Sequence, residues 1–70
     1  MDIAAKIKAV RLAKKAADNG HDWTQAACAL RAGMTQSQWA DLEAGRRMPR
    51  LDTLERIAAG LGCPLAELVS

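Results

Sequence analysis

Side chains that commonly do chemistry are scarce in this sequence. It has no tyrosine or phenylalanine, and only two tryptophans, two cysteines and one histidine in 70 residues. Cys28 and Cys63 lie far apart with no second ligand at short spacing, so we predict neither a metal site nor a cofactor. A single disulfide between them is the alternative to two free thiols, and we expect free thiols because a small domain without an export signal commonly keeps its thiols reduced. Paired carboxylates and a phosphate-binding glycine-rich loop are also missing, and no enzymatic activity is predicted.

Long apolar runs are absent as well. No segment approaches the ~20 apolar residues that span a bilayer, and no signal peptide is visible, so we expect a cytoplasmic protein without a membrane partner. With 50% apolar and 26% charged residues, the chain is expected to form one small domain over residues 1–70. Its formal net charge of +2 is only a weak indication of a polyanionic partner.

Helix-favouring residues dominate, and no run alternates apolar and polar residues as a half-buried strand would. We therefore predict an all-α fold. The apolar spacing predicts an extended first helix over residues 3–17, followed by helices over 24–32, 36–43, 51–60 and 64–69. The first is expected to end at Asp18, with Asn19 or Gly20 in the left-handed conformation.

Capping residues mark the starts of the second and third helices. Either Thr24 or Asp22 can cap the second helix. Thr35 with Gln38 three residues later matches a capping box at the start of the third. The two short helices are joined through residues 33–35, which is a helix-turn-helix arrangement. In DNA-binding proteins of this type the second helix of the pair enters the major groove, although many helical hairpins bind no nucleic acid.

The residues from position 23 onward are more specific than this pattern. They include Trp23-Thr24-Gln25, Ala29, Gly33, Thr35, Trp39, Leu42-Glu43, Gly45, Pro49, Thr53-Leu54 and Ile57-Ala58. Together they resemble the lambda-repressor-like (Cro-type) helix-turn-helix family over residues 23–68. The resemblance implies a compact five-helix domain that binds specific double-stranded DNA and regulates transcription as a repressor. Residues 7–11 are similar to the family's first helix, but Arg11 lies further from Gln25 than in the family.

The resemblance also implies two groups of DNA contacts. The base-reading residues would be Gln36, Ser37, Gln38 and Asp41. The phosphate-binding residues would be Gln25, Arg46, Arg47 and Arg50. A glutamine amide can bond bidentately to adenine, whereas a carboxylate beside DNA needs a cytosine amino group or an arginine partner. Each of these residues also has an ordinary interpretation as part of a solvated helix or loop.

The remaining expectations concern packing and partners. Trp23 and Trp39 are expected to pack in the core, with Trp39 partly exposed because it is large for its site. Glu43 is expected to make a structural hydrogen bond or ion pair. One module of this size has little surface for tight binding, so we expect a homodimer on a two-fold symmetric site. The candidate dimer contacts are Leu65, Leu68 and Val69, which could equally complete the monomer core.

A protein-interaction module is the alternative function. An antitoxin whose main partner is a protein would fit the acidic middle of the chain and Asp41. Strong salt dependence of duplex binding would separate the two functions.

Overall fold

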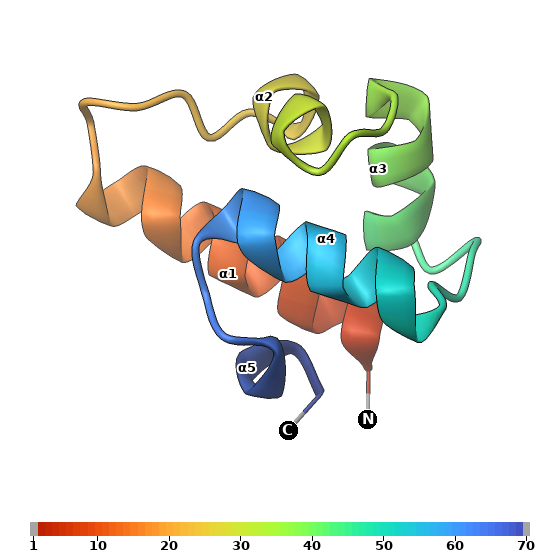
Figure 1. Cartoon of the computed structure of the whole chain (residues 1–70). Coiled ribbons are helices and arrows are strands. Elements are labelled where there is room, and N and C mark those ends of the chain that lie inside the picture. The colour runs from red at the N-terminus through yellow and green to blue at the C-terminus, as the bar shows by residue number, and fades with distance from the viewer. Residues whose placement is uncertain (1, 70) are drawn as a thin grey trace.

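The computed structural model describes residues 2–69, which form five helices and no strand (Figure 1). The helices are α1 (Ile3–Ala17), α2 (Gln25–Arg31), α3 (Gln36–Glu43), α4 (Leu51–Leu61) and α5 (Leu65–Val69). The all-α, five-helix prediction is confirmed, and each boundary lies within one residue of the expected one. None of these helices has the length and apolar character needed to cross a bilayer.

Two layers of helices enclose the core. α1 and α4 pack against each other, α2 lies over α4, and α3 packs against both α2 and α1 (Figure 1). The short α5 covers the opposite side of α1 and α4. The whole domain measures 30 × 24 × 19 Å. This arrangement leaves α3 at one end of the molecule, with one side free.

Every helix contributes to one apolar core. Its buried members are Ile7, Cys28, Ala29, Ala32, Trp39, Leu42, Leu54, Ile57, Ala58, Leu61 and Leu68. Trp39 is fully buried, so the expectation that it would be partly exposed is wrong. A buried carboxylate accepts the indole N–H of Trp39, so the large ring lies in the core without an unsatisfied donor.

The apolar residues of α5 also pack on this core. Leu68 is fully buried, whereas Leu65 and Val69 are half-buried against the core. Of the three candidate dimer contacts, Leu68 therefore completes the monomer, and only the other two retain surface that a second copy could cover.

α2 and α4 approach each other closely at Gly60. A Cβ atom at this position would lie 3.2 Å from the Cys28 carbonyl oxygen and 3.2 Å from the Ala32 nitrogen. Both neighbours are backbone atoms, which can move only if α2 moves. Glycine at position 60 therefore sets the distance between these two helices.

The connection between α1 and α2 differs from the expected left-handed cap. Within residues 2–69, positive φ occurs only at three other glycines, so neither Asn19 nor Gly20 adopts that conformation. Asp18 is instead extended, and its carboxylate accepts the backbone N–H of Gly20 at 3.0 Å and bonds His21 Nδ1 at 2.7 Å. These side-chain bonds stabilise the turn without a left-handed residue.

Candidate nucleic-acid interface

The turn between α2 and α3 is held by backbone bonds and by an arginine from α4. Gly33 has φ of 73°, and the N–H of Met34 donates to the Ala29 carbonyl at 2.9 Å. Arg56 donates from Nε to the Ala32 carbonyl at 2.9 Å and from Nη2 to the Gly33 carbonyl at 3.0 Å. The sequence analysis did not single out Arg56, because a side chain that bonds distant backbone carbonyls leaves no local pattern.

Capping residues define where α2 and α3 begin. The Thr24 hydroxyl accepts the N–H of Ala27, so Thr24 rather than Asp22 caps α2. At α3 the expected capping box is present: Thr35 Oγ1 accepts the Gln38 N–H at 3.1 Å, and Gln38 Oε1 accepts the Thr35 N–H at 2.9 Å. These reciprocal bonds fix the first turn of α3.

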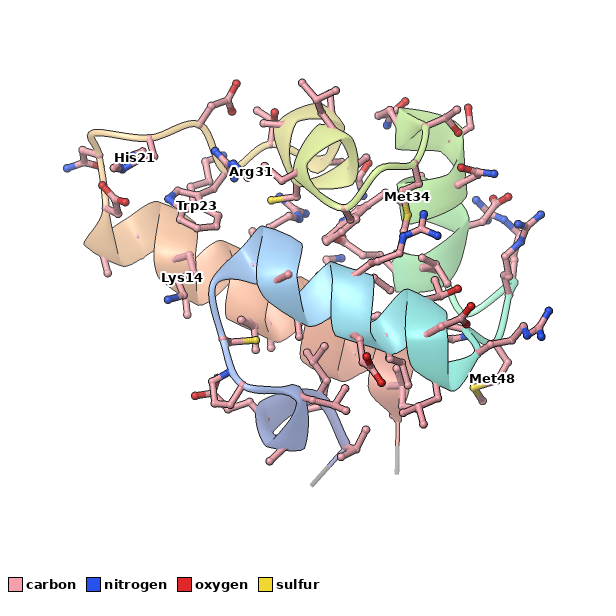
Figure 2. The ribbon with its side chains drawn as sticks, viewed as in Figure 1. Lys14, His21, Trp23, Arg31, Met34 and Met48 are labelled. Atoms are coloured by element: carbon pink, nitrogen blue, oxygen red, sulfur yellow. The ribbon has the colours of Figure 1, made fainter. Side chains whose placement is uncertain are left out.

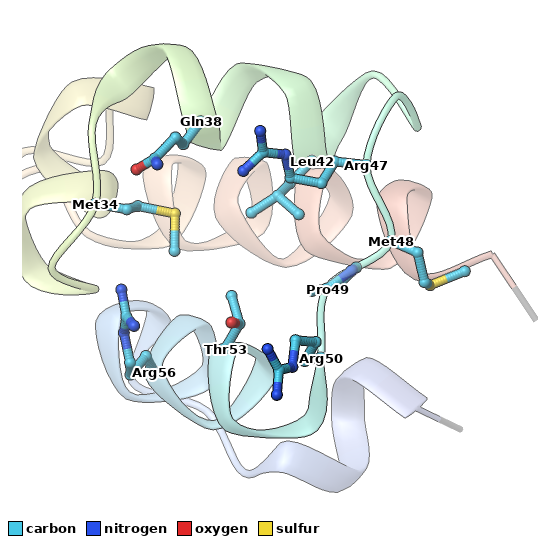
Figure 3. Close-up of a pocket in the computed structure, with 9 residues that line it drawn as sticks. All are labelled: Met34, Gln38, Leu42, Arg47, Met48, Pro49, Arg50, Thr53 and Arg56. Carbon is cyan, nitrogen blue, oxygen red and sulfur yellow. The ribbon is translucent and has the colours of Figure 1, made fainter.

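The capping box engages the side chain of Gln38, one of the predicted base-reading residues. The oxygen of Gln38 is occupied by the cap, and its side chain lines a groove between α3 and α4 (Figure 3). Gln38 therefore lies at the edge of the exposed surface of α3. The structural role of Gln38 is to cap the N-terminus of α3.

A buried carboxylate joins α1, α2 and α3. The side chain of Glu43 is 3% exposed and accepts Arg11 Nε at 2.6 Å and Arg11 Nη2 at 3.0 Å. Gln25 Nε2 donates to Glu43 Oε1 at 3.1 Å, and the Trp39 indole N–H donates to Glu43 Oε2. Arg11 also donates to the Trp23 carbonyl at 3.2 Å. The structural role expected for Glu43 therefore takes the form of a bidentate ion pair.

The same bonds set the ionisation of the pair. Burial alone would raise the pKa of the Glu43 carboxyl, but the hydrogen bonds from Arg11, Gln25 and Trp39 outweigh burial and hold that pKa below its ordinary value. The hydrogen bond to Glu43 raises the pKa of Arg11 against the opposing effect of burial. Both groups are charged near neutral pH, and the ion pair joins α1 to α3, while the bond from Gln25 adds α2.

This carboxylate also orients two amides. A carboxylate only accepts hydrogen bonds, so Gln25 must turn its Nε2 toward Glu43 and its Oε1 away from it. That oxygen accepts Gln36 Nε2 at 3.0 Å. Within residues 2–69, no other hydrogen bond uses the second amide N–H or the oxygen of Gln36, which lies in the first turn of α3. These are the two atoms that a bidentate contact with adenine requires.

One side of α3 is free of the core. Ser37, Ala40, Asp41 and Ala44 follow the i, i+3, i+4, i+7 spacing of a single helix face, which we call the outer stripe. Ser37 and Ala44 are exposed, and Ala40 and Asp41 are half-exposed. The two alanines were not predicted as site residues, although this spacing would have found them. Small apolar side chains permit close approach to bases and can contact a thymine methyl group.

Three of the predicted phosphate-binding residues are arginines in the loop between α3 and α4. Arg46, Arg47 and Arg50 are all exposed. Arg47 and Arg50 line the groove of about 240 Å³ between α3 and α4, and Arg56 lines its other end (Figure 3). Arg46 instead donates from Nε to Asp41 Oδ1 at 2.9 Å. Gln25, the fourth predicted phosphate contact, lies beside Gln36 at the other end of α3.

A second group of aromatic and basic side chains lies far from this end. Lys14, His21, Trp23 and Arg31 gather at the opposite end of the molecule from Met48 (Figure 2). The Trp23 ring packs partly on the core, with the Arg31 guanidinium 4.7 Å from its centroid. Trp23 therefore has a structural role, as expected.

Both thiols are at least partly buried. Cys28 and Cys63 are free, as expected, and burial raises the pKa of each thiol. Buried thiols of this kind pack as small apolar side chains.

Two helices joined by a tight glycine turn, the second with one free face, define a helix-turn-helix domain. Comparison with known proteins agrees, because a family described as "Helix-turn-helix domain" matches residues 2–69. The chain belongs to this family. It is also 35% identical over 69 residues to an immunity repressor protein of Bacillus phage phi105. That match covers 99% of this chain and 43% of the relative, so the chain spans less than half of the relative's length. No solved structure matches the chain.

Neither comparison points to the protein-interaction module considered as the alternative. The description of the matched family and that of the curated relative name a helix-turn-helix domain and a repressor.

Proposed function

We propose that this chain is the sequence-specific DNA-binding domain of a transcriptional repressor and that it places α3 in the major groove of double-stranded DNA. The observation that carries the proposal is the outer stripe of α3, which is free while the opposite face of the same helix is anchored in the core. The major groove, about 12 Å wide, admits one helix of this kind. Membership of the helix-turn-helix family and similarity to a phage repressor support the regulatory role.

Base recognition would come from the first two turns of α3. Gln36 presents one N–H and its Oε1, which match the N7 and N6 groups of adenine. Ser37 is exposed one residue further on and can donate to or accept from several bases. Gln38 is left with its amide N–H groups, because its oxygen belongs to the capping box.

Phosphate contacts would lie on both sides of the outer stripe. Gln25 keeps one amide N–H after bonding Glu43, and it lies at the start of α2. Arg47 and Arg50 supply positive charge on the side of α4. Such contacts provide most of the affinity for DNA and little sequence information.

A homodimer would double this surface. Two copies on a two-fold symmetric site would place their recognition helices about one helical turn apart, roughly 34 Å. Leu65 and Val69 retain apolar surface for the contact between copies. Light scattering over a concentration series, with and without duplex, tests this part: a protein that stays monomeric in both would remove the dimer.

Selection of bound oligonucleotides from a random duplex pool tests the function itself. We expect enrichment of one sequence, with a palindrome if the protein binds as a dimer. Affinity should fall steeply with salt, with a log–log slope of about −0.9 for each phosphate contacted. A pool without enrichment, or binding insensitive to salt, would contradict the proposal.

Three variants separate base reading from phosphate binding. Gln36→Ala should cost about 1–3 kcal/mol on the selected site and little on unrelated duplex. Arg47→Ala should weaken binding to both duplexes and reduce the log–log salt slope by about one unit, as expected for the loss of one phosphate contact. Lys15→Ala removes an equal charge at the far end of α1 and serves as the control, with little effect expected on either duplex.

A further inference from the structure

Arg46 is tied to the end of α3 by two separate bonds to one residue. Its side-chain Nε donates to Asp41 Oδ1 at 2.9 Å, and its backbone N–H donates to the Asp41 carbonyl oxygen at 3.0 Å. Gly45, with φ of 76°, turns the chain so that both bonds can form. The Arg46 side chain is therefore folded back along α3, although it is 66% exposed.

The carboxylate makes Arg46 a poor phosphate ligand. An arginine that only attracts the DNA backbone needs no acidic partner, because the partner cancels its charge and repels phosphate. The neighbouring Arg47 fits that simpler role, since within residues 2–69 it contacts no carboxylate. Asp41 also lies on the outer stripe, where an unpaired negative charge would oppose DNA binding. Both costs are avoided if the pair acts as one recognition element.

The free donors of Arg46 match the guanine of one base pair. Asp41 occupies Nε, and no other bond within residues 2–69 uses the Nη1 and Nη2 groups, which can donate side by side to O6 and N7 of guanine. An A·T pair presents an amino donor where guanine has O6, and it would meet the guanidinium donors unfavourably.

We propose that Asp41 and Arg46 together read one G·C base pair, with Arg46 donating to guanine and Asp41 acting as its positioning residue. This inference rests on the proposed function, because it names a base read by the same helix. It also gives Arg46 a different role from the phosphate contact implied by the family resemblance.

Binding of the 70-residue chain to its selected duplex, and to every single-base-pair variant of that duplex, tests the proposal by fluorescence anisotropy. The wild type should prefer G·C at one position by about 5- to 150-fold. Arg46→Ala should reduce that preference to near one and leave the other positions unchanged. Arg47→Ala is the matched control and should weaken all duplexes by a similar factor. Circular dichroism checks that each variant is folded.

Asp41→Ala gives the sharper readout, because two effects of opposite sign are expected. The G·C preference at that position should fall, since Arg46 is no longer held in place. Affinity for unrelated duplex should rise, since a negative charge is lost and Arg46 becomes free to bind phosphate. In the Arg46→Ala background, Asp41→Ala should change the preference no further. A variant that merely damaged the fold would lower both quantities.

The outcomes distinguish this inference from the proposed function. If the wild type selects a sequence but Arg46→Ala behaves like Arg47→Ala, Arg46 is an ordinary phosphate contact and the pair does not read a base. If Asp41→Ala leaves the G·C preference intact, Asp41 does not position Arg46. If the wild type prefers no base pair at any position, both the inference and the proposed function fail.

Discussion

The buried ion pair of Arg11 and Glu43 offers the strongest test of how the domain holds α3. Glu43→Gln keeps the shape of the side chain but removes its charge and one acceptor oxygen. Arg11 would then remain buried, with its side chain 10% exposed, opposite a neutral amide. The new amide would also have to turn its own N–H groups toward donors from Arg11, Gln25 or Trp39. The substitution therefore leaves both a charge and polar groups without proper partners.

The expected loss is large compared with the stability of a domain this small. Breaking a buried ion pair by neutralising one partner costs about 3–5 kcal/mol. Natural domains are stable by roughly 0.05–0.15 kcal/mol per residue, or about 4–10 kcal/mol for this chain of 70 residues. At about 4–8 °C per kcal/mol, the melting temperature should fall by roughly 12–40 °C.

The assay is thermal and urea unfolding followed by circular dichroism at 222 nm. Asp41→Asn is the matched control, because it neutralises a carboxylate of the same helix whose arginine partner is exposed. Exposed pairs contribute about 0–1 kcal/mol, so this control should unfold close to the wild type. In the double variant, Arg11→Met with Glu43→Gln, the loss of unfolding free energy should be smaller than the sum of the losses in the two single variants. If Glu43→Gln costs no more than Asp41→Asn, the pair does not anchor α3 and the reasoning is refuted.

Three further outcomes follow from single contacts. Thr35→Ala removes the cap of α3 and should cost about 1 kcal/mol in urea unfolding; an unchanged midpoint would mean that packing alone starts the helix. Gly60→Ala places a Cβ against backbone atoms of α2 and should cost about 1–3 kcal/mol, whereas a gain in stability would show that α2 can move away freely. The pKa of Glu43 is lowered in the folded state, so its contribution is complete above the unfolded value of about 4.3 and is lost as the pH falls through the folded value. Unfolding between pH 7 and pH 3 should therefore be less acid-sensitive in Glu43→Gln, and equal slopes would contradict this.

The positions of the helices were predictable because their signals are local. Thr35 and Gln38 form the capping box at the residues where their spacing placed it. Gly45 stands two residues after the last residue of α3, where a helix commonly ends in the left-handed conformation, and its φ is positive. Hydrogen bonds between residues three or four apart need no tertiary context, so a reading of neighbouring residues can find them. The loop at residues 18–24 was less predictable, because either a left-handed residue or hydrogen bonds from the Asp18 side chain can form that turn.

The candidate site was predictable only in part. The residues of α3 and the arginines that follow it were named from their place in the motif, and the structure brings them to one end of the molecule. Their individual roles depend on partners that the motif does not contain. Gln38 is drawn into the cap, and Arg46 is drawn to Asp41.

The amino-acid sequence by itself determined five amphipathic helices and the turn between α2 and α3, because period, caps and glycines act over a few residues. Only the tertiary structure decided that Arg11 would meet Glu43 across 32 positions and that Trp39 would fit wholly inside. It also decided that two glutamines would be oriented by one buried carboxylate. Such contacts depend on how three helices pack, because a buried charge must be paired and only the packing brings its partner within reach.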